Sequence, residues 1–333
     1  MRIRDINLQS KLLSGFLFVS IMVILSAIAG YISLNQLSGE MKNVFEEKLP
    51  VKDVSMEASI SLQELQGTAS DYLLATQNLQ EQKSDIKAEL DIVKMWLKVL
   101  QSGTENRNFQ DSPAAQTYKK HGLGIQMPYV SAKVKELASQ TAGKLQALEK
   151  HLYDSIQARN RELALYNKLD KGLNQLDKSY AKIRSSLLEL DSQANSLKSS
   201  TLLKAQLHLA SLKALSNEYT SKDKLDAAYK QKWHKKYDQI LAVWNNLAPQ
   251  LPSEIRSSFS AFAKNGKKLM RTAESALQKK QEAIDCKNML QDVGFQINEG
   301  LVKIEVQADQ EMQSGITAAN NARSHGVPTL IIV

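Results

Sequence analysis

The stretch from Leu12 to Leu34 reads LLSGFLFVSIMVILSAIAGYISL, and none of its residues is charged. A helix needs about 20 apolar residues to cross the hydrocarbon core of a membrane. Inside lipid, only a helix lets such a run satisfy its own backbone hydrogen-bonding groups. The stretch therefore predicts a transmembrane helix over residues 12–34, to which the polar remainder of the chain is tethered.

A cleaved secretory signal is the alternative interpretation of this stretch. Ala27, Ala29 and Gly30 resemble the small-residue cleavage site of such signals, whose apolar run is about 7–15 residues long. The longer run here, followed at once by an amphipathic pattern, favours an uncleaved anchor. Three of the first 11 residues are basic and one is acidic. Because basic flanks stay in the cytoplasm, we expect residues 1–11 there and the body in the periplasm of a bacterium with two membranes.

The last eight residues, Gly326 to Val333, read GVPTLIIV. One interpretation is the hydrophobic tail of a complete protein. The other, which we favour, is that residues 326–333 begin a second transmembrane helix. Residues 35–325 would then be an extracytoplasmic loop held at both ends.

Composition restricts the function. The formal net charge is +8, and its spread along the chain favours a solvated helical surface over a nucleic-acid patch. Cys286 is the single cysteine, which excludes a disulfide framework and a cysteine-based zinc site. The five histidines lack metal-ligand spacing, and there is no Gly-rich phosphate loop. We expect a protein that is not an enzyme and has no metal or other cofactor.

Apolar residues recur at alternating steps of three and four throughout the body, which indicates packed helices. The order is short, short, long, short, short, long, and its two halves repeat at an offset of roughly 144–148 residues, judged from the pattern. The chain thus predicts an all-α fold, in which a six-helix body forms two stacked four-helix bundles after one transmembrane helix. The expected helices cover residues 41–72, 86–100, 131–190, 203–214, 229–247 and 253–308, with a loop at 103–129 containing a short helical piece near 114–120.

Polar residues interrupt the apolar seams of both long helices. They are Ser155, Arg159 and Glu162 in one helix, and Lys280 and Lys287 in the other. A charge at a core position is costly unless it is paired. These residues either meet at the junction of the two bundles or mark a seam that drifts into solvent, and the pattern leaves both alternatives open.

This layout resembles the helical bimodular sensor domains of methyl-accepting chemotaxis receptors and of some hybrid sensor histidine kinases, such as trimethylamine-oxide sensors. The start LQSKLLSGF (Leu8–Phe16), the pair Leu49-Pro50 and the helix end DYLLA (Asp71–Ala75) are similar to chemoreceptors. The resemblance implies a chemoreceptor sensor region that passes a helix shift across the membrane. The alternatives are the sensor half of a two-component histidine kinase and a ligand-free membrane-tethered coiled-coil scaffold.

One departure bears on the ligand. Relatives that bind dicarboxylates carry two arginines one and two turns before the tyrosine that corresponds to Tyr72, where this chain has Gln66 and Ala69. A carboxylate needs such cations to replace its lost hydration. The resemblance therefore implies the fold and a sensing role, and not an organic-acid ligand.

Two groups of residues are the candidates for ligand binding. In the bundle near the membrane these are Arg184, Tyr180, Tyr72, Gln66 and His208. In the second bundle Trp96, Trp233, Trp244 and Tyr237 could form an aromatic cage for a cationic or ring-bearing ligand. The alternative for each aromatic residue is a layer of the core.

The expected partners follow from this architecture. We expect a homodimer through the membrane-proximal helices, and either a small-molecule ligand or a periplasmic binding protein. The membrane is the remaining partner, and no nucleic acid is expected.

Overall fold

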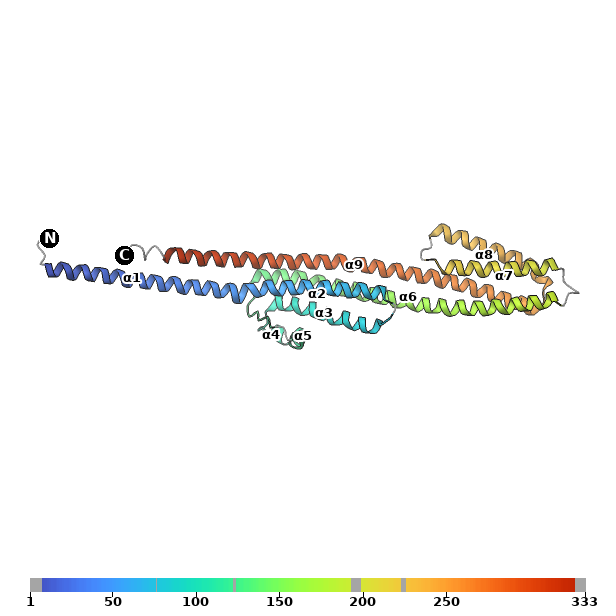
Figure 1. Ribbon diagram of the computed structural model, residues 1–333, viewed down its shortest axis with the longest axis horizontal. Coiled ribbons are helices and arrows are strands. Elements are labelled where there is room, and N and C mark those ends of the chain that lie inside the picture. The colour runs from blue at the N-terminus through green and yellow to red at the C-terminus, as the bar shows by residue number, and fades with distance from the viewer. Residues whose placement is uncertain (1–7, 76, 122–123, 193–198, 223–225, 327–333) are drawn as a thin grey trace. The chain divides into compact units, whose positions relative to one another are not determined.

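The computed structural model describes residues 8–75, 77–121, 124–192, 199–222 and 226–326. Within these ranges all regular structure is helical (Figure 1), which confirms the predicted all-α class. The chain divides into two compact units: unit 1 contains residues 1–150 and 290–333, and unit 2 contains residues 151–289. Two continuous helices, α6 (Ala132–Ser192) and α9 (Ser253–Gly326), contribute residues to both units.

The N-terminal part is one uninterrupted helical run of α1 (Leu8–Asn43), the π-helical turn η2 (Val44–Lys48) and α2 (Leu49–Leu74). Pro50 has no N–H to donate and crowds the carbonyl four residues earlier. In the π-helical turn before it, the N–H of Leu49 instead bonds the carbonyl of Val44. The helix thus continues through Pro50 without a break.

Most side chains of residues 12–34 are exposed. By length and composition, this helix is apolar enough to cross a membrane. The predicted second span falls on residues 326–333, of which 327–333 lie outside the described residues.

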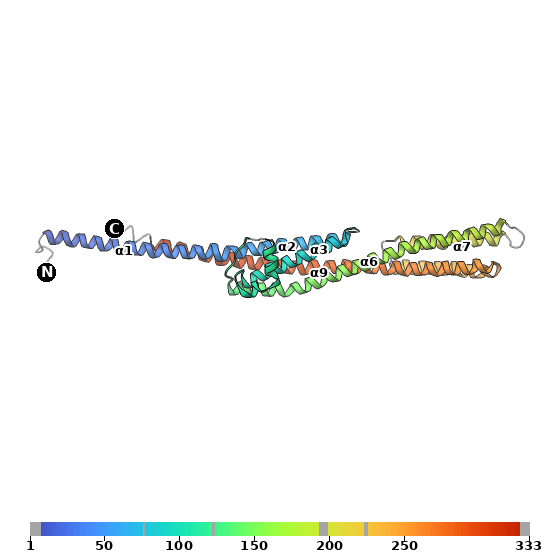
Figure 2. The same ribbon diagram turned by 90° about the horizontal axis from the view of Figure 1, so that it is seen from below.

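Unit 1 is built on four helical segments: α2, α3 (Leu79–Ser102), the start of α6 and the end of α9. Helices α2 and α3 pack against each other (Figures 1 and 2). Large apolar side chains such as Leu65, Leu90, Leu148 and Ile304 are fully buried between the segments. Polar contacts join each neighbouring pair, namely Thr68 to Glu89, Lys94 to Glu149, Lys144 to the Gln296 carbonyl and Lys52 to Asp309.

The loop after α3 carries two short helices, α4 (Arg107–Gln110) and α5 (Pro113–His121), as predicted near residues 114–120. Gly103 has a φ of +77°, and a β-carbon there would collide with the carbonyl of Met127. Glycine is therefore required at this turn.

Unit 2 consists of the second part of α6, α7 (Ser199–Thr220), α8 (Ala227–Leu247), the short 3₁₀ turn η3 (Ala248–Gln250) and the first part of α9. Helix α2 ends at Leu74 and α7 ends at Thr220, both within the gaps between the expected helices, at 73–85 and 215–228. The expected gap at 191–202 falls largely on residues 193–198, outside the described ranges. Aromatic rings fill much of the core of unit 2. Trp244 stacks on Phe259 with ring centroids 3.4 Å apart.

The polar seam residues of α6 are buried and do not drift into solvent. Ser155 is 1% exposed and Glu162 is 2% exposed. Arg159 Nη1 lies 2.7 Å from Glu162 Oε2. All three belong to unit 2, together with the half-buried Lys280 and Lys287. The buried charge of Glu162 is thus paired with an arginine one turn earlier on the same helix.

Candidate ligand-binding site

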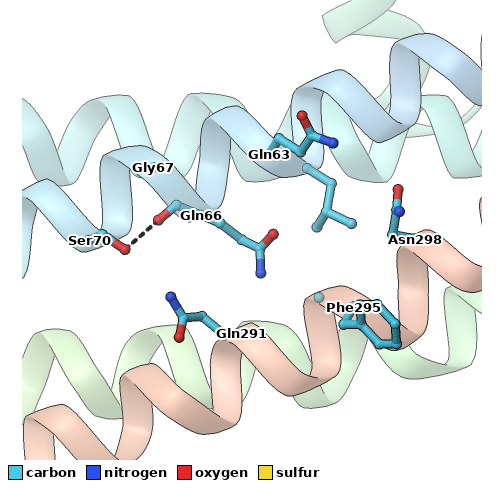
Figure 3. Close-up of a pocket in the computed structure, with 9 residues that line it drawn as sticks. Gln63, Gln66, Gly67, Ser70, Gln291, Phe295 and Asn298 are labelled. Atoms are coloured by element: carbon cyan, nitrogen blue, oxygen red, sulfur yellow. Dashed lines mark hydrogen bonds between the residues drawn. The ribbon is translucent and has the colours of Figure 1, made fainter.

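A pocket of about 470 Å³ lies between α2 and α9 in unit 1 (Figure 3). Helix α2 contributes a continuous strip of its surface, and α9 contributes the facing strip. The lining residues are Leu62, Gln63, Gln66, Gly67 and Ser70 from α2, and Gln291, Gly294, Phe295 and Asn298 from α9. The pocket is thus formed by two helices that are far apart in sequence.

Two glycines make room for this pocket. A β-carbon at position 294 would collide with the side-chain amide of Gln66. A β-carbon at Gly67 would meet nothing within 4 Å. Leu62, which is 1% exposed, joins the pocket to the apolar core. Because Gly67 and Gly294 carry no side chains, a hollow remains between α2 and α9 where larger residues would otherwise pack together.

The polar groups of the pocket are amides and a hydroxyl. Figure 3 shows the Gln66 amide in the space between the helices and Gln291 reaching from α9. Ser70 Oγ donates a hydrogen bond of 2.8 Å to the main-chain carbonyl of Gln66. At one end, Ser59 Oγ donates to Asn298 Oδ1. An amide offers both donors and an acceptor, so the lining can bind either kind of group on a ligand.

The electrostatics of the pocket exclude a cationic anchor. No charged residue lines it. Residues 53–82 and 288–302 contain no Lys or Arg. The charged residues on these stretches nearest the lining are acidic, namely Glu64, Asp71, Asp292 and Glu299. These two stretches of helix therefore offer no cationic partner to an anion.

Of the residues predicted for the membrane-near site, Gln66 lines the pocket. Tyr72 is 1% exposed in the core of unit 1 and is not part of the lining. Its neighbour one turn earlier, Ala69, is also buried.

The prediction that Tyr180, Arg184 and His208 share an interior with Gln66 is wrong. All three belong to unit 2, whereas Gln66 belongs to unit 1. Arg184 is exposed because its neighbour Ile183 occupies the core, and adjacent helical residues point about 100° apart. Tyr180 is half-buried, with Lys213 Nζ 4.6 Å from its ring centroid.

The predicted aromatic cage is also corrected. Trp96 lies in unit 1, where its ring makes an edge contact with Tyr118. Trp233, Tyr237 and Trp244 lie on α8 in unit 2 and are at most 3% exposed. Trp233 stacks on Tyr237, with centroids 5.2 Å apart. These rings form layers of two separate cores.

The side chains missed by the sequence reasoning are Gln63, Ser70, Gln291, Phe295 and Asn298. One feature of the sequence could have indicated them: a second stripe of residues recurs at steps of four and three along α2, beside the core seam. It consists of Met56, Ile60, Gln63, Gly67, Ser70 and Leu74. Met56, Ile60 and Leu74 on this stripe are large, apolar and exposed. A helix with two such stripes has one for its own core and one for another partner.

A cluster of ionic contacts, which we call the polar latch, joins the N-terminal helix to α9 in unit 1. It consists of Lys48, Lys52, Ser131, Asp309 and Glu311. Lys48 Nζ lies 3.2 Å from Glu311 and Lys52 Nζ lies 3.0 Å from Asp309, while Ser131 Oγ donates to Glu311 at 2.8 Å. Burial acts to raise the pKa of Glu311, but hydrogen bonds from Gln307, Ser131 and Lys48 outweigh it and lower the pKa below the usual value.

The positive charge is not spread along the chain as predicted. Residues 227–273 carry nine Lys and Arg against two Asp and Glu, a net +7 of the +8 for the whole chain. Seven of these cations are exposed, namely Lys232, Lys235, Lys236, Arg256, Lys264, Lys268 and Arg271. We call this surface of α8 and α9 the basic hairpin. Lys267 forms its 2.7 Å ion pair with Asp238.

The comparison with known families bears on the part of the chain that forms the pocket. Residues 5–96 match a known sensory module. The family is described as a four helix bundle sensory module for signal transduction. The match covers α2, which supplies half of the pocket, and confirms the predicted resemblance to helical sensor domains of chemoreceptors. Among curated proteins, none matches the chain.

Within the ranges that the structure describes, no three His, Cys, Asp or Glu side chains gather as metal ligands would.

Proposed function

We propose that this chain is the membrane-anchored sensory region of a bacterial chemoreceptor, with its body in the periplasm and its N-terminus in the cytoplasm. It acts by binding rather than by catalysis. One observation carries the proposal: the α2–α9 pocket is formed by the helix that continues into the apolar segment and by the last helix of the described chain. The match of residues 5–96 to a signal-transduction module supports the same role.

Helix continuity supplies the route for the signal. Helix α2 runs without a break through η2 into α1, and α9 continues from the pocket to Gly326. A ligand that touches both helices favours one relative position of the two. Helix shifts of about 1–2 Å are typical of such switches, and a shift requires that the ligand bind one packing better than the other. The polar latch lies between the pocket and α1, where long Lys and Glu side chains can re-pair after a shift.

We also propose a homodimer through α2. Met56 and Ile60 are 45% and 47% exposed on the second stripe of this helix. A stripe at alternating steps of three and four suits a parallel pair of helices. An Ile60→Cys variant in a Cys286→Ala background should cross-link between copies in the membrane, whereas a cysteine at Lys135, exposed on α6, should not.

The sensing mechanism is tested by locking the two pocket helices. The hydrogen bond between Ser59 and Asn298 brings these side chains together, so cysteines there can be joined by oxidation or by a short dithiol cross-linker. In a receptor fused to a characterised cytoplasmic signalling domain, the locked Ser59→Cys/Asn298→Cys variant should give a fixed output with no response to ligand. The reduced variant is the control. A locked receptor that still responds would overturn the helix-shift mechanism.

Topology is tested by labelling with a membrane-impermeant maleimide. The native Cys286 is a poor target, since burial and the nearby Asp154, Asp285 and Glu282 raise the pKa of its thiol. A Gln239→Cys/Cys286→Ala variant places an exposed thiol on α8. Labelling once the outer membrane is permeabilised, without opening the inner membrane, is expected. Labelling only after cell lysis would overturn the periplasmic assignment.

A further inference from the structure

We propose that the α2–α9 pocket recognises an uncharged ring compound, which places one flat face on Phe295 and the polar groups of its edge on the surrounding amides. This inference rests on the proposed sensing function and adds the chemical class of the ligand. Nucleobases and pyranose sugars share this chemistry, and the experiment below separates them.

The charge distribution carries the first step. A carboxylate or phosphate that leaves water needs a cationic partner. The lining has none, and neither stretch of helix around it has a Lys or Arg. A bound ammonium group would equally lack a carboxylate in the lining. Only a ligand without a formal charge loses no ionic hydration in this pocket.

The amides carry the second step. Gln63, Gln66 and Gln291 enter the lining with side-chain amides that make no hydrogen bond among the described residues. A planar amide presents a donor and an acceptor side by side, as in the pairing of Asn or Gln with the edge of a base. Ser70 from α2 and Asn298 from α9 add further polar groups to the lining. A ring with donors and acceptors along its edge matches this arrangement better than an aliphatic chain does.

Phe295 carries the third step. Its side chain is 64% exposed at the pocket. An aromatic ring held on a helix with its face open offers stacking to a base or to the C–H face of a sugar. The volume of about 470 Å³ lies in the range of about 300–1,000 Å³ that is usual for small-molecule sites.

Gly294 supplies a specific test. A methyl group at position 294 collides with the Gln66 amide and pushes it from its place between the helices. Alanine favours the helix, so the Gly294→Ala variant should fold. Gly143→Ala is the matched control, because its β-carbon meets nothing within 4 Å and α6 does not line the pocket.

The experiment measures binding by calorimetry to the full chain in lipid nanodiscs. The first set of probes is glucose, glucuronate and glucosamine, and the second is uracil and its 6-carboxylate, orotate. We expect glucose or uracil to bind, and the charged analogues of the binding compound to bind at least about tenfold more weakly, since each tenfold corresponds to the loss of one good interaction. Gly294→Ala should weaken binding about tenfold, while Gly143→Ala should leave it unchanged.

The set whose neutral member binds identifies the source of the ring. Equal or tighter binding of glucuronate or orotate would overturn the inference, and so would equal effects of the two glycine variants. If neither neutral compound binds, the inference also fails. None of these outcomes decides the proposed sensing function. That function is tested separately, by comparing the response of the locked and reduced Ser59→Cys/Asn298→Cys receptor.

Discussion

The side-chain amide of Gln66 lies over the α-carbon of Gly294, so closely that any β-carbon at position 294 would collide with it. A residue on α2 thus occupies the space that a side chain of α9 would fill. The Gln66 amide therefore lies inside the contact between α2 and α9, among the residues that line the pocket. The selectivity of the pocket should therefore change with residue 66.

A Gln66→Arg substitution should convert the pocket from neutral to anionic ligands. The native lining contains no charged residue, so the guanidinium would be its single cation. A carboxylate gains binding free energy from charge-assisted hydrogen bonds to such a partner. We expect glucuronate or orotate to bind at least tenfold more tightly to this variant than to the native chain, at about the scale of one charge-assisted hydrogen bond. Calorimetry with Gln77→Arg, an exposed position outside the pocket, provides the control; the same gain in both variants would contradict the prediction.

Gly300 is expected to be required for the contact between α6 and α9. A β-carbon there would collide with Thr141 Oγ1, which is held by its 2.8 Å hydrogen bond to the Leu137 carbonyl. Gly300→Ala should lower the free energy of unfolding by about 1–3 kcal/mol through overpacking. Gly143→Ala, with open space around it, should raise it by up to about 1 kcal/mol. Thermal unfolding compares the two variants. If both were more stable than the native chain, α6 and α9 could move apart at position 300 without a loss of stability, and the prediction would be wrong.

The polar latch should make unit 1 sensitive to acid. Because the folded-state pKa of Glu311 is lowered from its usual 4.5, its contribution to stability is present above that value and is lost as the pH falls through the folded pKa. Glu311→Gln should cost about 1–2 kcal/mol at neutral pH, as a hydrogen-bonded charge is removed. The difference in melting temperature between native and variant chains should shrink below pH 4.5.

The control for this experiment is Glu64→Gln, an exposed carboxylate outside the latch. Its effect on the melting temperature should be small at every pH. A Glu311→Gln difference that stays constant as the pH falls would argue that Glu311 contributes by packing rather than by charge.

The buried pair Arg159–Glu162 should respond differently to single and double substitution. The two side chains are 11% and 3% exposed. Glu162→Leu leaves the guanidinium without this carboxylate and should cost about 3–5 kcal/mol, whereas Arg159→Met/Glu162→Leu should be neutral or stabilising. Chemical denaturation measures both. A double variant as unstable as the single one would indicate that the pair contributes net stability.

The basic hairpin should be destabilised by its own charge. Lys235→Glu and Lys268→Glu replace exposed cations on α8 and α9 and reduce the repulsion within a surface of net +7. We expect each variant to melt at a higher temperature at low salt, with a gain that shrinks as salt screens the charges. Lys87→Glu, an exposed lysine on α3, is the matched control. A gain that is independent of salt would point to helix propensity instead.

Much of the architecture could be predicted from periodicity. Steps of three and four place Leu148, Leu176 and Ile304 in helical cores, and all three are buried. The candidate site could be predicted only at Gln66. Tyr180 follows the same periodicity and Arg184 lies next to the core residue Ile183, but a helical pattern gives the face of a residue and not its neighbours on other helices. The error with Trp96 has the same origin, since the pairing of α3 with α2 places it in unit 1.

The sequence alone determined that the chain is helical, that an apolar segment of membrane-spanning length opens it, and that long helices alternate with pairs of short ones. These features are local, because helix formation and lipid partitioning depend on composition and spacing within one segment. Only the tertiary structure decided that Gln66 faces Gly294, that nine residues from α2 and α9 line a pocket without charge, and that Glu162 is buried beside Arg159. Such contacts depend on which helices are neighbours and on how their surfaces align, and periodicity within one helix does not specify either.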